Sequence, residues 1–235
     1  MILVFPQATT AFNALFEEMI SSSDATSFLE SSFASYNMQQ ISKVVLILLE
    51  NNLVEGFLRD YLSHSELIKE FEILVLKKET SGSICTTLMA IHKLQDQKVI
   101  ISALDQIIIG GKIDIEILED SNDFDVIVPT YESDNPSLCY VLRDDKGKAI
   151  QLFEKKAVSP EAILGVYIFR NFSMFSDNCF ELLVKYKGFK NRIFYTSDVI
   201  NNFISKDLKL DFPFLKSQYI KVRDLRDFRN IKKAL

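Results

Sequence analysis

Lys98-Val99-Ile100-Ile101-Ser102-Ala103-Leu104-Asp105-Gln106 is an almost uninterrupted apolar run that ends in a carboxylate and an amide. Such a run is typical of a strand covered on both faces, as in a parallel sheet. It therefore predicts a strand over residues 98–103 with Asp105 at its carboxyl tip. In open α/β sheets, ligands bind at that edge.

Asp105 has two interpretations that the sequence leaves open. A carboxylate at a strand end suits Mg²⁺, which takes one or two protein carboxylates and completes its shell with phosphate oxygens. A strand-terminal Asp is also a common turn or cap residue. The first interpretation makes Asp105 a metal ligand with Mg²⁺ as cofactor.

The preceding segment completes a strand–helix–strand unit. Residues 71–76 predict a strand and residues 84–94 a helix, with Ser81-Gly82-Ser83 between them. This order is that of a βαβ unit. Small residues let a backbone approach a flat or anionic ligand, and the first N–H groups of the helix point to the same edge. An ordinary capped loop has the same composition.

The remaining segments predict an α/β domain spanning residues 1–235. Strands are expected at 2–5, 44–49, 124–130 and 162–169, a hairpin at 137–156, and helices at 11–20, 53–62 and 221–233, with a further helix after the cap at 21–24. We expect a single doubly wound mixed sheet with helices on both faces and a β-hairpin insertion. Its central strands would be 44–49, 73–76, 99–103 and 126–128. The acidic residues at 116–125 are interpreted as a solvated face.

Composition excludes several classes of function. The net charge of −5 argues against nucleic-acid binding, which requires a basic face. Three widely spaced cysteines without a C-x-x-C pair predict reduced thiols. No apolar stretch reaches the roughly 20 residues of a membrane span, and no basic flank of a signal peptide is present, so we expect a cytoplasmic protein. Neither His64 nor His92 has a nucleophile at a spacing typical of a catalytic triad.

Four short motifs, taken in order, resemble the sugar-phosphate nucleotidyltransferases, and in particular the small bacterial ones of surface-polysaccharide synthesis. They are a T-x-G loop before a helix (Thr80, Gly82), a strand ending in D-Q (Asp105, Gln106), an S-x-x-Y to E-K-K hairpin (residues 137–156) and an A-x-x-G-x-Y strand (Ala162, Gly165, Tyr167). A weaker fifth piece is residues 194–202. The resemblance implies a GT-A-like fold.

The resemblance also implies a set of site residues that should converge on one cleft. Lys155 and Asp105 would be catalytic, with Asp105 holding Mg²⁺ and the loop of residues 81–83 facing the base. Either Lys155 or Lys156 would meet the acceptor phosphate. The ligands would be a nucleoside triphosphate or nucleotide-sugar and a sugar phosphate. The implied substrate-binding residues are Thr80, Ser81, Gly82, Ser83, Gln106, Tyr140, Glu154, Lys156 and Gly165.

The amino-terminal segment departs from the family pattern. Such enzymes place a G-x-G-[ST]-R loop and a P-K segment after the first strand, but this chain has no glycine before Gly56 and no Lys or Arg before Lys43. The late metal-binding Asp of the family has only Asp224 or Asp227 as counterparts. Phosphoryl transfer depends on positioning and cationic stabilisation, so we expect poor transfer unless Lys43 or Arg59 has taken the role.

Three functions remain open at this point. The chain is a nucleotidyltransferase of sugar or surface-polysaccharide metabolism, a non-catalytic binding or regulatory relative, or a GT-A-type glycosyltransferase with a nucleotide-sugar donor. The second explains both the motifs and the missing loop, whereas the third lacks a D-x-D motif. A homo-oligomer or a partner subunit is compatible with all three.

Overall fold

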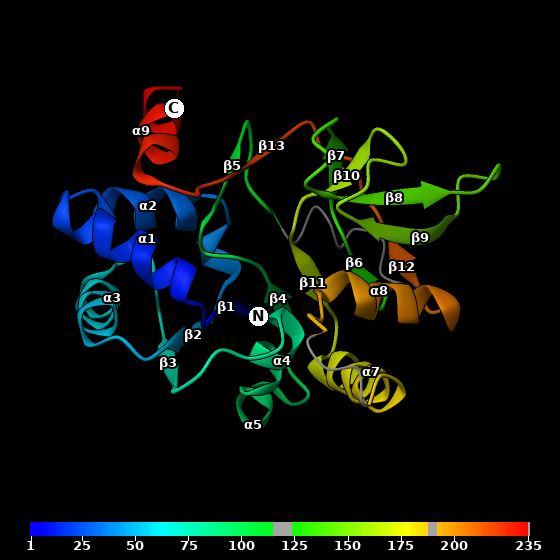
Figure 1. The fold of residues 1–235 in the computed structure, drawn as a ribbon, viewed down its shortest axis with the longest axis horizontal. Coiled ribbons are helices and arrows are strands. Elements are labelled where there is room, and N and C mark those ends of the chain that lie inside the picture. Colours follow the sequence, from blue (N-terminus) through cyan, green and yellow to red (C-terminus); the bar gives the residue numbers. More distant parts are fainter. Residues whose placement is uncertain (115–123, 188–191, 235) are drawn as a thin grey trace.

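The computed structural model describes residues 1–114, 124–187 and 192–234, and its centre is a seven-stranded sheet (Figure 1). The strand order is β12-β6-β11-β4-β1-β2-β3. β11 runs antiparallel to β4 and β6, and the other neighbours are parallel. The strands are β1 (Ile2–Gln7), β2 (Lys43–Leu49), β3 (Phe71–Leu76), β4 (Val99–Ile101), β6 (Val126–Ile127), β11 (Tyr167–Phe169) and β12 (Leu210–Asp211).

Strand β1 shows why the sheet is covered on both faces. Leu3 and Phe5 pack into one apolar core, whereas Ile2 and Val4 pack into the other. Alternate side chains of a strand point to opposite faces, so a strand that is apolar from residue 2 to residue 6 must be covered on both faces. Phe5 also meets Phe33 edge to face at a ring distance of 5.9 Å.

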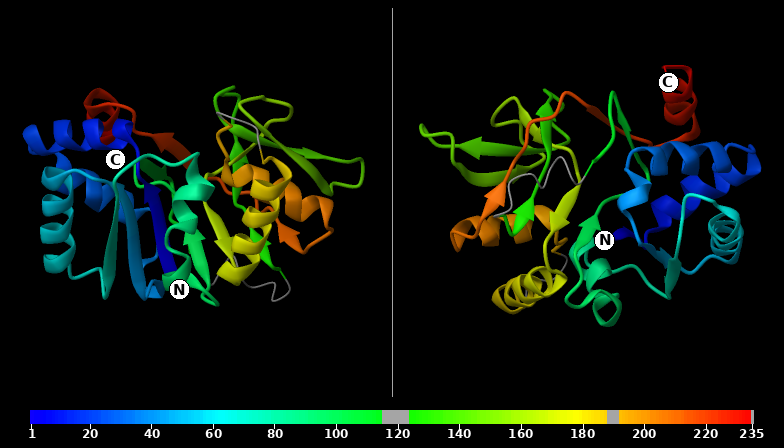
Figure 2. Two further views of the ribbon diagram at one scale, coloured as in Figure 1. Left: turned by 60° about the horizontal axis from the view of Figure 1, so that its bottom comes forward. Right: turned by 180° about the vertical axis from the view of Figure 1, so that it is seen from behind.

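Two groups of helices supply these covers (Figures 1 and 2). One face carries α1 (Thr10–Ser21), α2 (Ala25–Ala34), α3 (Asn52–His64) and α9 (Leu225–Ala234). The other carries α4 (Ser83–Leu88), α5 (Ile91–Leu94), α7 (Phe172–Lys185) and α8 (Thr196–Ser205). The chain is therefore a doubly wound α/β fold.

Two smaller sheets complete the fold. An antiparallel sheet has the order β7-β10-β8-β9, with β7 (Thr130–Glu132), β10 (Glu161–Ile163), β8 (Cys139–Arg143) and β9 (Ala149–Glu154). Its β8–β9 pair is the predicted hairpin. β5 (Gln106–Ile109) pairs antiparallel with β13 (Gln218–Lys221). This pairing brings the carboxyl-terminal segment against the residues that follow β4.

The prediction that residues 73–76 form a central strand was wrong. Strand β3 lies at the edge of the large sheet, where Lys43 and Lys93 form ion pairs with its Glu72 at 3.0 Å each. These two lysines hold the pKa of Glu72 below its ordinary value of 4.5. An apolar run alone does not distinguish an edge strand from a central one.

Other corrections concern segments that change direction. The predicted strand 162–169 is two strands in different sheets, β10 and β11, because the chain turns at Gly165, where φ is +75°. The segment 124–130 likewise contains β6 and the start of β7. The predicted helix 84–94 is the two short helices α4 and α5, and residues 194–195 before α8 form no strand. Most of the acidic segment 116–125 lies outside the described residues.

All three thiols are free, and burial raises the pKa of each.

In the described part of the chain, no helix combines the length and apolar character needed to cross a membrane.

Candidate ligand-binding cleft

The cleft lies where the sheet changes its winding direction. From β1 the chain builds β2 and β3 on one side and then returns to place β4 on the other side. Parallel sheets bind ligands at such a switch point, outside the carboxyl ends of the strands. A cleft of about 570 Å³ opens there, within the usual range for small-molecule sites. Its walls come from parts of the segments 6–15, 80–86, 101–106, 165–167, 193–196 and 221–223, together with Glu154.

Asp105 is held in the cleft by contacts to the backbone on both sides of it. Ser32 donates from its hydroxyl to the Leu104 carbonyl, and the Ile108 N–H donates to the Ser35 hydroxyl at 2.9 Å. The Val222 N–H donates to the Asp105 carbonyl at 2.8 Å. Both serines are buried, Ser32 on α2 and Ser35 at its carboxyl-terminal cap. Short side chains let this helix approach the backbone that carries Asp105, and their hydroxyls satisfy polar groups that would otherwise be unpaired.

The Asp105 carboxylate is mostly enclosed, with 13% of its side chain exposed. Its Oδ2 lies 3.4 Å from the Lys221 Nζ, an ion pair that joins two segments far apart in the sequence. Its Oδ1 is buried and has no hydrogen-bond partner in the described part of the chain. Of the two carboxylate oxygens of Asp105, Oδ2 therefore faces the Lys221 ammonium, and Oδ1 is left without a partner in the described residues.

These surroundings fit a magnesium site poorly. Within residues 1–114, 124–187 and 192–234, no group of three His, Cys, Asp or Glu side chains is arranged to hold a metal. Both alternative late acids serve helix α9: the Asp227 N–H donates to Asp224 Oδ1, and Asp227 Oδ2 accepts from the Arg223 N–H. A dication at Asp105 would also lie next to the Lys221 ammonium, and like charges at such distances repel.

The start of helix α1 is occupied by a carboxylate of the chain itself. Thr9 caps the helix by accepting a hydrogen bond from the Phe12 N–H at 3.1 Å. The N–H of Thr10 and its hydroxyl both donate to Glu79 Oε1, the hydroxyl at 2.7 Å. These two bonds lower the pKa of Glu79. The positive end of the helix, which could attract a phosphate, therefore already has an anion.

Neither of the two cations considered as replacements reaches the cleft. Lys43 pairs with Glu70 and Glu72 at the edge of the sheet. Arg59 pairs with Glu55 one turn earlier in α3. Neither residue is among those that line the cleft.

Gln7 is a cleft residue that the sequence reasoning missed. It stands at the carboxyl end of β1, is 5% exposed, and its Nε2 is buried without a hydrogen-bond partner in the described residues. A buried unpaired donor costs about 1–3 kcal/mol, so a ligand acceptor that reached it would be favoured. The available signal was a polar residue at the tip of an apolar strand.

Two glycines at the cleft have structural reasons to be glycine. Gly82 has φ of +110°, and an added Cβ would lie 2.3 Å from the Phe194 carbonyl oxygen. Gly165 has φ of +75°, and its Cβ would lie 2.9 Å from Gln106 Oε1. Gln106 in turn donates from Nε2 to the Leu164 carbonyl at 3.1 Å. From the sequence we expected the space beside Gly82 to admit a ligand. In the structure the backbone of Phe194 occupies that space.

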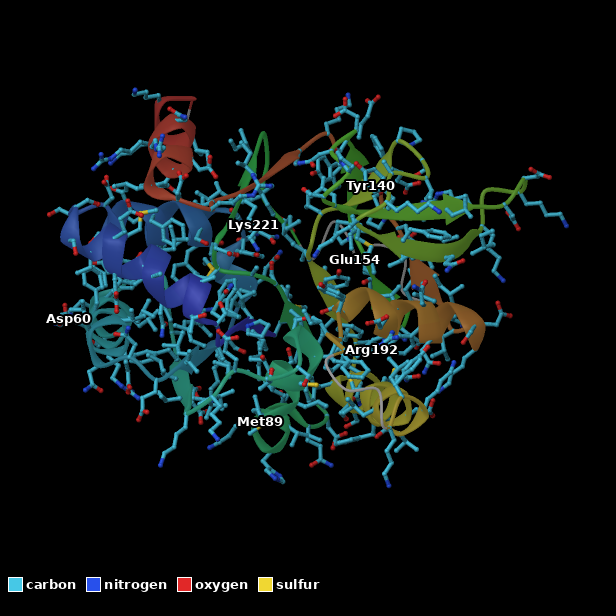
Figure 3. The ribbon with its side chains drawn as sticks, in the orientation of Figure 1. Asp60, Met89, Tyr140, Glu154, Arg192 and Lys221 are labelled. Atoms are coloured by element: carbon cyan, nitrogen blue, oxygen red, sulfur yellow. The ribbon has the colours of Figure 1, made fainter. Side chains whose placement is uncertain are left out.

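The structure brings most of the predicted site residues together. The cleft is lined by Thr80, Gly82, Ser83, Asp105, Gln106, Glu154 and Gly165. Lys155 stands at the rim, where its Nζ lies 3.3 Å from the hydroxyl of Tyr195, which does line the cleft. In Figure 3, Glu154 lies on the side of β9 and α8, and Lys221 on the side of α1 and α2.

Three predicted residues lie elsewhere. Tyr140 is fully buried and donates from its hydroxyl to the Asn135 carbonyl at 2.7 Å, which corrects its assignment as a substrate contact. Lys156 lies over the Phe153 ring, 5.4 Å from its centre, and does not line the cleft. Ser81 accepts a hydrogen bond from the Phe194 N–H at its carbonyl and is also outside the lining.

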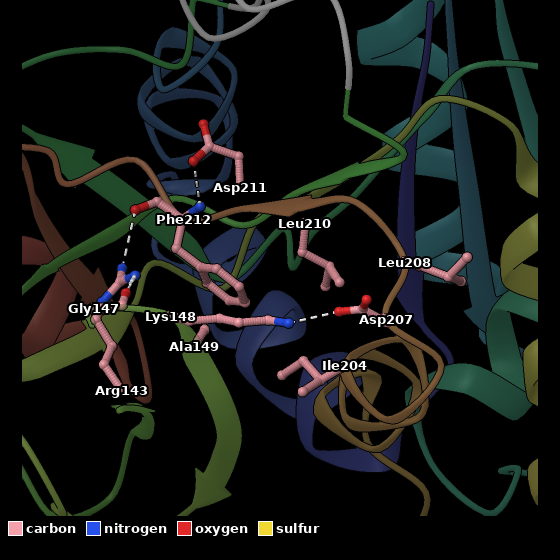
Figure 4. A pocket seen from close by; sticks show the side chains of 10 residues that line it. All are labelled: Arg143, Gly147, Lys148, Ala149, Ile204, Asp207, Leu208, Leu210, Asp211 and Phe212. Carbon is pink, nitrogen blue, oxygen red and sulfur yellow. Dashed lines mark hydrogen bonds and ion pairs between the residues drawn. The ribbon is translucent and has the colours of Figure 1, made fainter. Parts of the chain in front are cut away.

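A second cavity is a weaker candidate (Figure 4). It measures about 200 Å³ between β8, β9 and the segment after α8. Its charged groups already have partners: Lys148 pairs with Asp207 at 2.6 Å, and Arg143 pairs with Glu161. A ligand there would have to displace these ion pairs.

Searches with the sequence found no matching protein-family model and no matching curated protein. Solved structures do match over nearly the whole chain. The nucleoside-diphosphate-sugar pyrophosphorylase from Vibrio cholerae RC9 has a TM-score of 0.71 at 18% identity, covering 99% of this chain and 100% of that one.

Two further solved structures also match this chain over nearly its whole length. A Bacillus anthracis protein assigned as a glucose-1-phosphate thymidylyltransferase, in complex with sucrose, has a TM-score of 0.76 at 12% identity, covering 99% of this chain and 94% of that one. A UDP-glucose pyrophosphorylase in complex with UDP-glucose has a TM-score of 0.69 at 14% identity, covering 99% and 97%. The chain therefore has the fold of the sugar-phosphate nucleotidyltransferases.

Proposed function

We propose that this chain binds a nucleotide-sugar, or a nucleotide together with a sugar phosphate, in the cleft at the carboxyl ends of β1 and β4, and that it transfers nucleotidyl groups slowly or not at all. The observation that carries the proposal is the cleft itself. It lies at the switch point of the sheet and combines an unpaired Gln7 donor with the basic residues Lys221 and Arg223. Among the structural neighbours, one is named a nucleoside-diphosphate-sugar pyrophosphorylase and another was solved with UDP-glucose.

Slow transfer follows from the charges around the start of α1. No Lys or Arg precedes Lys43, and the Glu79 carboxylate accepts the Thr10 N–H and hydroxyl. A triphosphate at this position would meet an anion instead of the cations that stabilise its transition state. We therefore favour a binding or regulatory role within sugar or surface-polysaccharide metabolism, in the cytoplasm.

Ligand binding is tested by thermal shift and calorimetry with UDP-glucose, dTDP-glucose, GDP-mannose and the corresponding triphosphates. A ligand present at 100 times its dissociation constant adds about 2.7 kcal/mol to stability. Ala11, an exposed cleft residue on α1, gives a blocking variant, Ala11→Trp. Ala34→Trp is the matched control, since Ala34 is also an exposed helical alanine but lies outside the cleft.

The expected result is a stabilising ligand among the nucleotide-sugars whose effect is lost in Ala11→Trp and kept in Ala34→Trp. If no nucleotide or nucleotide-sugar binds, or if Ala11→Trp binds as well as the unmodified chain, the proposal is wrong.

Catalysis is tested with a coupled pyrophosphate assay on triphosphate and sugar 1-phosphate pairs. Loss of one preorganised contact to the developing charge typically costs about 10²–10³ in kcat, and here both the loop and its cations are missing. We expect no pyrophosphate above background. Robust turnover that disappears in Asp105→Asn would mean that the chain is a working enzyme. Release of UDP from UDP-glucose in the same preparation tests the glycosyltransferase alternative.

A further inference from the structure

Backbone contacts of the neighbouring residues position the ion pair between Lys221 and Asp105. β13 pairs with β5 so that Lys221 stands opposite Gln106, the residue after Asp105. The next residue, Val222, donates its N–H to the Asp105 carbonyl at 2.8 Å and is fully buried. Two backbone contacts therefore place the lysine side chain beside this carboxylate, and the 3.4 Å pair follows from the strand register.

We infer that the Lys221 ammonium takes the place of a divalent cation at Asp105, and that the cleft holds the phosphate oxygens of its ligand through Lys221 and Arg223 without a metal. The inference rests on the proposed function for the identity of the ligand. The claim about the metal stands on the residues alone.

Among the described residues, each of the two acidic residues that line the cleft already has a partner in the chain at one carboxylate oxygen. Asp105 Oδ2 faces Lys221, and Glu154 Oε2 accepts a hydrogen bond from the Ser197 hydroxyl at 2.9 Å. A metal ion at Asp105 would have to displace the Lys221 ammonium. The pairing of β13 with β5 holds the backbone of Lys221 next to Asp105, so this ammonium stays close to the carboxylate. Magnesium also needs near-octahedral oxygen ligands, and this cleft offers few carboxylates to start such a shell.

The basic residues are placed to meet an anionic ligand. An ammonium group has three donors, so Lys221 can keep Asp105 and still donate to phosphate oxygens. Lys221 and Arg223 flank the buried Val222, and both line the cleft. Both cations therefore face the same cleft, although they are two residues apart in the chain. Across the described residues, no hydrogen bond or ion pair engages the Arg223 guanidinium.

The metal claim is tested with Mn²⁺, whose free signal is followed by electron paramagnetic resonance. The unmodified chain is expected to leave millimolar Mn²⁺ free. Lys221→Asp removes the ammonium and adds a carboxylate, so it should bind Mn²⁺ at least about tenfold more tightly. This gain should vanish in the double variant Asp105→Asn/Lys221→Asp. Binding of Mn²⁺ by the unmodified chain that is lost in Asp105→Asn would overturn the inference.

The ligand claim is tested by calorimetry with UDP-glucose in EDTA and in MgCl₂. Equal affinity in the two buffers is expected, together with about a tenfold loss in Lys221→Met, because a charge-assisted hydrogen bond is removed. Lys146→Met is the matched control, because Lys146 is exposed in the turn between β8 and β9. Binding only with Mg²⁺, or unchanged binding by a folded Lys221→Met, would overturn the inference.

The two arms separate this inference from the proposed function. If neither UDP-glucose nor the other nucleotide-sugars bind, the proposed function fails, while the Mn²⁺ titration still decides whether Lys221 excludes a metal from Asp105. Thermal melts of every variant show whether it is folded, and the double variant Asp105→Asn/Lys221→Met leaves no unpaired charge at this position.

Discussion

Replacement of Gly82 by alanine is expected to destabilise the chain through a backbone contact and not through the loss of a ligand. Gly82 has φ of +110° and ψ of 177°, a region that is essentially open only to glycine and costs other residues about 1–3 kcal/mol. An added Cβ would lie 2.3 Å from the Phe194 carbonyl oxygen and 2.8 Å from the Phe194 nitrogen. Both neighbours are backbone atoms, which cannot rotate out of the way.

Relief of this contact requires the segment around Phe194 to move. The Phe194 N–H donates to the Ser81 carbonyl at 2.8 Å, and that bond would be lengthened or lost. Its net value of about 0.5–1.5 kcal/mol adds to the backbone strain, which gives a total of about 1.5–4.5 kcal/mol. This is a large fraction of the 5–15 kcal/mol by which domains are usually stable.

Urea unfolding followed by circular dichroism measures the loss of unfolding free energy. The dependence of that free energy on urea concentration should be the same in the variant and the unmodified chain. The melting temperature should fall by roughly 2–4 °C per kcal/mol for a chain of this size. Two glycines serve as controls. Gly147 has φ of +80° with no atom within 4 Å of a Cβ, so Gly147→Ala should cost only the backbone term, about 1–2 kcal/mol. Gly56→Ala, at an exposed position of helix α3 with open space around it, should stabilise by about 0.5–1 kcal/mol.

Equal stability of Gly82→Ala and Gly147→Ala would refute the reasoning, because the Phe194 contact would then contribute nothing. A Gly82→Ala chain with unchanged stability but weakened UDP-glucose binding would restore the interpretation made from the sequence, in which this glycine admits a ligand.

Three other outcomes follow from the same structure. Ser35→Ala leaves the buried Ile108 N–H unpaired and should cost about 1–3 kcal/mol in urea unfolding, whereas Ser31→Ala, whose hydroxyl bonds only within its own helix, should stay within about 0.5 kcal/mol of the unmodified chain. The pKa of Glu72 is lower folded than unfolded, so the stability it contributes is complete above its ordinary value of 4.5 and is lost as the pH falls through the folded pKa; Glu72→Gln should flatten the acid side of a urea-midpoint profile, and an unchanged profile would contradict this. Burial raises the pKa of every cysteine, so iodoacetamide at neutral pH should label the native chain far more slowly than the urea-unfolded chain, and mass spectrometry showing equal rates would exclude this protection.

The regular elements of this fold were largely predictable because their signals are local. The apolar runs of β1, β2 and β4 and the hairpin turn between β8 and β9 depend on residues within one element. Each was predicted in place, and so were α1 and α3. The carboxyl tip of β4 was also a sound guide to the cleft, since Asp105 and Gln106 both line it.

The partners of those residues were decided by the tertiary structure. An apolar run does not state its position in the sheet, so the edge location of β3 and the division of 162–169 between two sheets required the strand order. Tyr140 carried a motif position but is fully buried in the apolar core that also contains Tyr131 and Ala162.

The same distinction holds for the chemistry of the cleft. Local patterns were enough to indicate an α/β fold with a carboxylate at a strand tip and an amino-terminal strand without a phosphate loop. Only the tertiary structure brought Lys221 to Asp105, Glu79 to the start of α1 and Phe194 to Gly82. These pairs join segments that are distant in the chain, and strand register and helix packing, which no local pattern records, set which groups meet.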